Sequence, residues 1–117
     1  MPPELNDDAL LRDMLDAARE ATGYVQGITA HAFQHDRMRQ RAIERCVEIV
    51  GEAARGVSKT YREAHPEIPW RPMVAQRHIL AHEYGDVLQE RIFRVATTHL
   101  PALVALLESL VPPAPER

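Results

Sequence analysis

The fold is decided by residues 38–56, MRQRAIERCVEIVGEAARG, in which apolar side chains recur at steps of three and four residues. This spacing places them along one face of an α-helix. Asp36 can cap the start of the helix, and His65 is expected to end it, because a residue before proline disfavours helical angles. We therefore expect one long helix over about residues 36–65. Its apolar positions are Met38, Ala42, Ile43, Cys46, Val47, Ile49, Val50, Ala53 and Ala54.

Two glycines, Gly51 and Gly56, lie within this expected helix. Each costs about 1 kcal/mol relative to alanine, so each needs a structural reason. A bend in the helix is one explanation, and the close approach of a second helix is another. We favour close packing.

A second apolar stripe precedes the long helix. Asn6 is a suitable capping residue and acidic side chains follow it, so we expect a first helix over roughly residues 6–29. The apolar positions of this stripe are Leu10, Leu11, Met14, Leu15, Ala18 and Ala21 or Thr22.

The segment HPEIPWRP, residues 65–72, contains three prolines and is expected to form a rigid connection. Ile68 and Trp70 are expected to pack against the bundle. A third helix then covers about residues 72–84, and Gly85 with Asp86 forms a break.

Two further helices complete the expected fold, one running from Val87 to Val95 and a short one in LPALVALLESL, residues 100–110. Pro101 occupies an allowed early position in the last helix. The sequence thus predicts an all-α, up-and-down bundle of four to five helices. We expect a single domain over residues 1–117, with frayed proline-rich ends at about 1–5 and 111–117.

Composition limits the class of protein. With 117 residues, the chain has the length of one compact domain, and 45% hydrophobic but only 5% aromatic content suits an aliphatic helical core. The single cysteine, Cys46, excludes an internal disulfide. The sequence shows neither a membrane-spanning apolar run nor a signal-peptide pattern, so we expect a cytoplasmic protein that does not engage a membrane.

The net charge of −3 argues against a protein that coats nucleic acid nonspecifically. Basic residues nevertheless concentrate in one segment. They either form a solvated helix face interleaved with Glu44, Glu48 and Glu52, or steer phosphates towards a site. These basic residues are Arg37, Arg39, Arg41, Arg45, Arg55, Lys59 and Arg62.

The strongest functional signal is RHILAHEY, residues 77–84, which brings together Arg77, His82 and Tyr84. An imidazole moves a proton near neutral pH, a guanidinium holds a phosphate, and a phenol accepts a transferred group. On a helix, Arg77 and His82 are about 140° apart around the axis and about 7.5 Å apart along it. The long stem of arginine and a loosening of the helix near Gly85 could still aim both groups at one phosphate. Alternatively, a twofold dimer can bring two such helix ends into one groove; we favour this route and expect a homodimer.

The order of IVGEA (49–53), PEIPW (66–70) and RHILAHEY resembles the HepT family of HEPN-domain ribonuclease toxins. The resemblance also extends to LRDMLDAAREATGYVQG (11–27), FQHDRMRQRAIERCVEIVGEAARGVS (33–58) and the C-terminal LPALVALLESL. Many members of this family carry asparagine directly after the motif arginine, whereas this chain has His78.

The resemblance implies the toxin of a type VII-like toxin–antitoxin system, a metal-independent endoribonuclease that cuts RNA. Arg77 and His82 would be catalytic. Tyr84 would be the AMP acceptor, modified by a cognate MntA-type nucleotidyltransferase antitoxin. The alternative is a non-catalytic helical HEPN module that binds RNA, nucleotide or a protein partner.

The chemistry of these side chains fits the ribonuclease hypothesis. His82 can take the proton of a ribose 2′-OH while Arg77 stabilises charge on the phosphate. His78 is either catalytic support, as an acid, a base or a hydrogen-bond donor, or a structural residue. Nucleotide phosphates on Tyr84 would place negative charge next to His82 and so compete with RNA.

No cofactor is expected. His78 and His82, four residues apart, can share a metal ion, but two ligands are too few. Glu83 is expected to point elsewhere on the helix, and Cys46, His31 and His35 have no ligand spacing with the two histidines. Cys46 lies in the apolar stripe, which predicts a buried, inert thiol.

Overall fold

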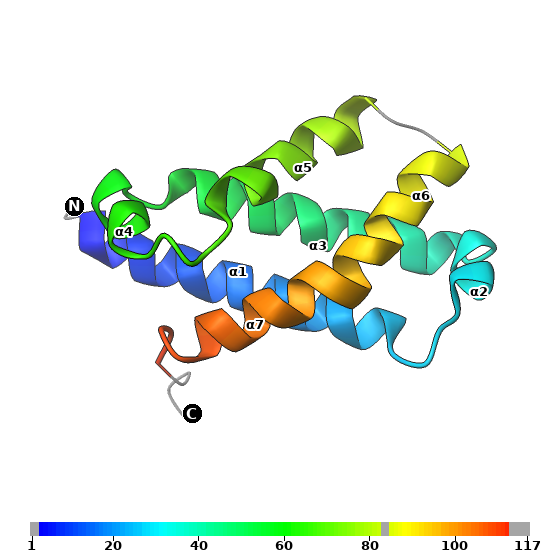
Figure 1. Cartoon of the computed structure of the whole chain (residues 1–117), viewed down its shortest axis with the longest axis horizontal. Coiled ribbons are helices and arrows are strands. Elements are labelled where there is room, and N and C mark those ends of the chain that lie inside the picture. The colour runs from blue at the N-terminus through cyan, green and yellow to red at the C-terminus, as the bar shows by residue number, and fades with distance from the viewer. Residues whose placement is uncertain (1–2, 83–84, 113–117) are drawn as a thin grey trace.

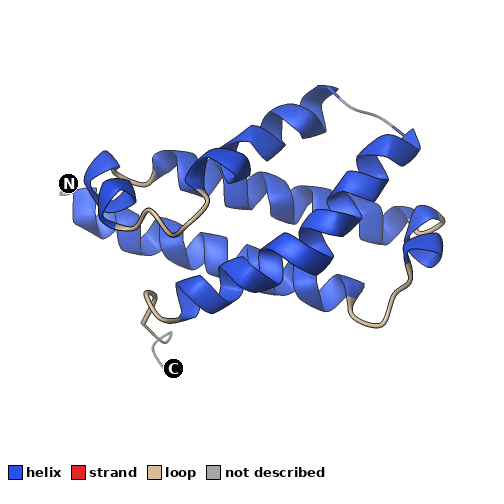
Figure 2. Cartoon of the chain, in the orientation of Figure 1, coloured by secondary structure: helices blue, strands red, loops and turns tan. Residues whose placement is uncertain are grey.

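The computed structural model describes residues 3–82 and 85–112, and the regular structure of these residues is entirely helical (Figure 2). Long helices there form an up-and-down bundle, which confirms the predicted all-α class. They are α1 (Pro3–Val25), α3 (Arg37–Gly56), α5 (Trp70–His82) and a continuous run of α6 (Gly85–Arg94), η1 (Val95–His99) and α7 (Leu100–Glu108). Two short helices, α2 (Ala30–Gln34) and α4 (Lys59–Ala64), lie at opposite ends of the bundle (Figure 1).

Helix α3 is the central element of the bundle. It packs antiparallel against α1 along most of its length, and α5 lies on it from the other side (Figure 1). The α6–η1–α7 run crosses the bundle obliquely and brings α7 onto α1. Buried side chains of these helices join into one hydrophobic cluster, which includes fully buried Met14, Phe33, Ile43 and Leu107.

The expected single helix over residues 36–65 is two helices. Asp36 caps α3 as predicted, and the hydrogen bond from the Arg39 amide lowers the pKa of this carboxylate. The helix ends at Gly56, because Val57 is extended and Ser58 caps α4 by accepting a hydrogen bond from the Tyr61 amide. The capping serine, four residues beyond the last apolar position of the stripe, was the signal that periodicity alone missed.

A buried carboxylate of α1 fixes this break. Ser58 donates to Asp7 through its amide, at 2.8 Å, and through its hydroxyl, at 2.6 Å. Asp7 is only 5% exposed. A Cβ added to Gly56 would lie 3.1 Å from Cδ1 of Leu10, so the close-packing explanation holds for this glycine. The end of α3 is therefore held against α1 by both polar and steric contacts.

The first expected helix is shorter than predicted at its C-terminal end and is followed by a helix that periodicity did not reveal. Helix α1 ends at Val25, four residues before the expected boundary, and Gly27 turns the chain with a φ of 76°. Thr29 then caps α2, its side chain accepting from the Ala32 amide. Helix α2 has five residues, too few to show an apolar repeat.

The proline-rich connection behaves as predicted at its apolar positions. Ile68 and Trp70 are buried, and Nε1 of Trp70 donates to the carbonyl of His65 at 2.9 Å. Helix α5 begins at Trp70, two residues earlier than expected, and is described as far as His82. Gly85, with a left-handed φ of 67°, opens α6, so Asp86 belongs to the first turn of that helix and not to the expected break.

The two expected C-terminal helices are joined by η1, a π-helical turn. The amide of Leu100 donates to the carbonyl of Val95, five residues back. Pro101, in the first turn of α7 as predicted, has no N–H to offer the carbonyl four residues before it. The wider turn accommodates the proline ring without ending the helix.

The expected frayed ends fall partly on residues 1–2 and 113–117, which lie outside the described part of the chain. Helix α1 already begins at Pro3, and Val111 is buried. Among the described helices, none is both long enough and apolar enough to cross a lipid bilayer.

Replacing Asp7 by alanine should destabilise the fold, because the Ser58 amide and hydroxyl would lose their acceptor in a buried position. We expect Asp7→Ala to lower the free energy of unfolding by about 1–3 kcal/mol, measured by urea denaturation. The matched control is Asp8→Ala, which removes an exposed carboxylate from the neighbouring position. Equal loss in the two variants would contradict a specific role for the Asp7–Ser58 contact.

Candidate functional site

Helix α5 carries the histidine pair on its exposed side. Both His78 and His82 are exposed, and their rings stack with centroids 5.9 Å apart and planes inclined by 15°. Their four-residue spacing puts them on one face of the helix, as predicted from the sequence.

This face points away from the bundle. Met73 of α5 is 7% exposed and belongs to the core. His82 lies nine residues further along, two and a half turns at ~3.6 residues per turn, and therefore on the opposite side of the helix. The imidazoles are thus available to a large ligand or to a second protein molecule.

An arginine from another helix joins the pair. His78, His82, Val74 and Ala81 line a pocket of about 490 Å³ together with Arg55, which lies in the last turn of α3. In the antiparallel pair the last turn of α3 lies towards the start of α5, so Arg55 lines this pocket from the side of Val74. A guanidinium in one pocket with two imidazoles can hold a phosphate while a ring nitrogen exchanges a proton.

Arg55 belongs to the basic segment noted in the sequence, and three other arginines of that segment pair with carboxylates. Arg41 pairs with Glu44 at 3.0 Å, Arg45 pairs with Glu48, and Arg39 pairs with the capping Asp36. For these arginines the solvated-face interpretation fits. Arg55 is the member of the segment that lines the His78–His82 pocket.

Two residues of the predicted site have no described side chain. Arg77 lies on α5, one residue before His78, but only its place on the helix is described. Tyr84 lies outside the described residues, between the end of α5 and the start of α6. Their roles therefore stay predictions from the sequence.

Cys46 is buried, with 3% exposure, and its sulfur lies 3.8 Å from a carboxylate oxygen of Glu20. Burial, followed by the nearby Glu20, raises the pKa of this thiol to about 11. The protonated form therefore dominates at neutral pH, as expected for an inert core cysteine. Among the described residues, no group of three or more His, Cys, Asp or Glu is placed to hold a metal ion.

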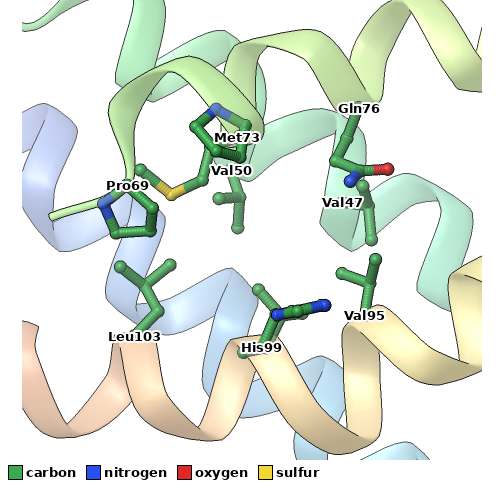
Figure 3. Close-up of a pocket in the computed structure, with 10 residues that line it drawn as sticks. Val47, Val50, Pro69, Met73, Gln76, Val95, His99 and Leu103 are labelled. Atoms are coloured by element: carbon green, nitrogen blue, oxygen red, sulfur yellow. The ribbon is translucent and has the colours of Figure 1, made fainter.

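An apolar pocket of about 200 Å³ lies elsewhere, between α3, α5 and the η1–α7 run (Figure 3). Valine, proline, methionine and leucine side chains form most of its lining, and Gln76 and His99 supply the polar groups. It contains none of the predicted site residues.

The bundle and its outward-facing histidines define a small all-α protein with an exposed histidine pair on α5. The family model described as Ribonuclease HepT-like matches residues 14–110. The chain therefore belongs to the HepT-like ribonuclease family, and this membership implies RNA as the class of substrate.

Individual relatives agree with this assignment. A Methanocaldococcus jannaschii protein named as an RNase is 30% identical over 95 residues, which cover 81% of this chain and 87% of the relative. A Thermococcus cleftensis protein named as a ribonuclease HepT is 31% identical over 100 residues, covering 86% and 91%. A Caldanaerobacter subterraneus protein named as an RNase is 35% identical over 79 residues, covering 68% and 70%. No solved structure matches the chain significantly.

Proposed function

We propose that this protein is the toxin of a type VII-like toxin–antitoxin system and cuts RNA without a metal ion. The observation that carries the proposal is the exposed His78–His82 pair with Arg55 in the same pocket, in a chain of a ribonuclease family. The whole chain acts as a single domain, in the cytoplasm, with no cofactor.

The proposed reaction needs a base, a cation and an acid. His82 takes the proton of a ribose 2′-OH, whose oxygen attacks the adjacent phosphorus. The bond from phosphorus to the 5′ oxygen breaks, and this oxygen takes a proton from a second group, for which His78 is the candidate. The products are a 2′,3′-cyclic phosphate and a 5′-hydroxyl.

Two arginines are available for the charge on the phosphate. Arg77 is the sequence candidate, and Arg55 is added by the structure. A guanidinium binds two phosphate oxygens at once, so it stabilises the extra negative charge that develops during attack. Arg55 therefore supports phosphate binding beside the imidazoles, in addition to the catalytic role expected of Arg77.

A homodimer completes this proposal. The histidines face away from their own bundle, and the helical separation of Arg77 and His82 does not make them neighbours by default. Twofold pairing of α5 would place Arg77 of one chain near His82 of the other. The site would then be shared between two chains.

The purified protein should cut RNA in EDTA, because its proposed groups are all side chains of the protein. His82→Ala should lower the cleavage rate by about 100-fold or more, the usual contribution of a positioned acid or base. Arg77→Ala should also lose activity, with helical content unchanged by circular dichroism. His31→Ala, at an exposed histidine on α2, is the matched control and should retain activity. Activity that requires a divalent ion, or an active His82→Ala, would contradict the mechanism.

Two inactive variants should complement each other if the site is shared. When Arg77→Ala and His82→Ala are co-expressed with different tags, half of the dimers contain one of each chain. Each mixed dimer then has one intact site of two, so about a quarter of wild-type activity should return. Cleavage assays on the mixture and sedimentation of each variant measure this. Dimers without recovered activity would place the site within one chain.

Control by an antitoxin forms the last part of the proposal. A cognate MntA-type nucleotidyltransferase with ATP should add AMP to Tyr84 and lower RNA cleavage, because the new phosphates compete with RNA for the same cations. Mass spectrometry should find AMP on the peptide that contains Tyr84, and Tyr84→Phe should escape modification. Tyr24→Phe and Tyr61→Phe are the matched controls. AMP on either of these tyrosines instead would contradict the assignment.

A further inference from the structure

The apolar pocket of Figure 3 lies on the side of α5 that faces the η1–α7 run. Met73 and Gln76 of α5 line this pocket, whereas His78 and His82 line the pocket that contains Arg55. Gln76 precedes His78 by two residues, which corresponds to ~200° around the helix axis. The two pockets therefore lie on opposite sides of α5, and a molecule in the apolar pocket contacts the back of the helix that presents the histidines.

The pocket has a buried inner part and an accessible opening. Val47 and Val50 of α3 form the inner part and are 3% and 2% exposed, whereas Pro72 and His99 are exposed. The ring of Pro72 fixes a backbone angle, so this part of the opening is rigid. An apolar cavity of about 150 Å³ binds benzene. The volume of about 200 Å³ therefore suits a single ring with a small substituent.

Two walls face each other across the pocket. Figure 3 shows Pro69 and Met73 on one side of the cavity, and His99 and Leu103 on the other. Val95 and His99, the first and last residues of η1, both line it, so the π-turn forms part of the second wall. Short π-helical turns often occur at functional sites. Two facing walls suit a flat ring, whereas a partner helix requires a groove with anchor positions over several turns.

Two polar side chains, Gln76 and His99, lie among the apolar residues of the pocket. Neither the Gln76 amide nor the His99 ring pairs with another side chain or backbone group of residues 3–82 and 85–112. Gln76 is half-buried, so a hydrogen bond made there is stronger than one in open water. The described lining residues include no Asp, Glu, Lys or Arg. A charged ligand would lose its hydration without a permanent counter-charge, so the pocket selects a neutral molecule.

We propose that this pocket binds a small neutral aromatic ring that carries a hydroxyl group, of which phenol is the simplest example. The ring lies between the two walls, and the hydroxyl forms a hydrogen bond with Gln76. A hydroxyl both donates and accepts, so it pairs with the amide in either orientation. The ligand contacts α5 and the η1–α7 run at once and so stabilises their relative position. The proposal concerns binding alone and does not rest on the proposed ribonuclease function.

Titration of the intact protein with phenol and toluene, followed by NMR, tests the proposal. The two molecules have nearly the same shape, and only phenol carries a hydroxyl. We expect phenol at millimolar concentration to shift the methyl signals of Val47, Val50, Met73 and Leu103. The absence of shifts, or shifts confined to residues outside the pocket, would overturn the proposal.

The hydrogen bond is measured with Gln76→Leu, which keeps the approximate size of the side chain and removes its polar group. Phenol and toluene differ in hydrophobicity, so the informative quantity is the ratio of their affinities. We expect the ratio of phenol to toluene affinity to fall about tenfold in Gln76→Leu, the loss expected for one hydrogen bond. Gln26→Leu, at an exposed glutamine after α1, is the matched control and should keep the wild-type ratio. An unchanged ratio in Gln76→Leu would overturn the role of the hydroxyl.

A larger side chain inside the pocket provides a second test. Val47→Phe places a ring in the cavity, so phenol binding should be lost while helical content stays unchanged by circular dichroism. Val50→Phe is the alternative if Val47→Phe does not fold. Val87→Phe, at an exposed valine of α6, is the matched control and should bind phenol as the wild type does. Phenol binding retained in a folded filled variant would place the ligand elsewhere and overturn the proposal.

A further probe separates a free ligand from a partner protein. N-acetyltyrosinamide carries a phenol on a peptide backbone, whose added groups exceed the volume of the pocket, so it should bind much more weakly than phenol. Binding as tight as that of phenol would assign the pocket to a tyrosine of a partner protein and overturn the free-ligand claim.

Hydrogen exchange tests the contact with both walls. In saturating phenol, amide exchange should slow in α5 and in the η1–α7 run, because the ligand packs between them. Amide exchange that is unchanged in α5 although phenol binds would overturn the placement of the ligand between the two walls.

Discussion

The packing of α1 against α3 supports every other part of this molecule. Helix α3 contacts α1, α2, α5 and α6, so its direction sets theirs. Its C-terminal end is held at a defined point on α1 by the Asp7–Ser58 hydrogen bonds and by the close approach of Gly56 to Leu10. Because Arg55 lies directly before Gly56, the contact that ends α3 also sets where Arg55 lines the His78–His82 pocket.

The histidine site is built on a helix with a single large supporting contact. Helix α5 packs mainly on α3, and its other side carries His78 and His82. This arrangement leaves the imidazoles exposed, without the buried surroundings that usually hold catalytic groups in place. Exposed side chains of this kind become buried only when another molecule binds over them. Pairing of two α5 helices and binding of RNA would each provide such enclosure.

Sequence periodicity was sufficient for the helical class and for the shared face of His78 and His82, since both depend on spacing within one helix. It failed where a single side chain decides between continuing and ending a helix. Ser58, four residues beyond the last apolar position of the stripe, caps a new helix, and Pro101 does not end one, because the π-turn before it makes room for the proline ring. Arg55 could not be assigned to the site from spacing, because only the pairing of α3 with α5 brings it there. The family resemblance, carried by ordered motifs, identified the ribonuclease family that the comparison with relatives shows.

The π-turn η1 also absorbs one residue. A π-turn contains one residue more than an α-turn, so the amide of Leu100 takes the place that the fourth residue after Val95 would hold in a regular helix. Helix α7 therefore keeps its apolar face on α1, where Leu103 and Leu107 are 2% and 0% exposed. A chain shortened by one residue between 95 and 99 would keep these leucines on α1, but the regular α-turn would bring the ring of Pro101 against the carbonyl four residues before it. The extra residue and the proline therefore belong together: a chain with another residue in place of Pro101 could lose one residue here and keep the packing of α7.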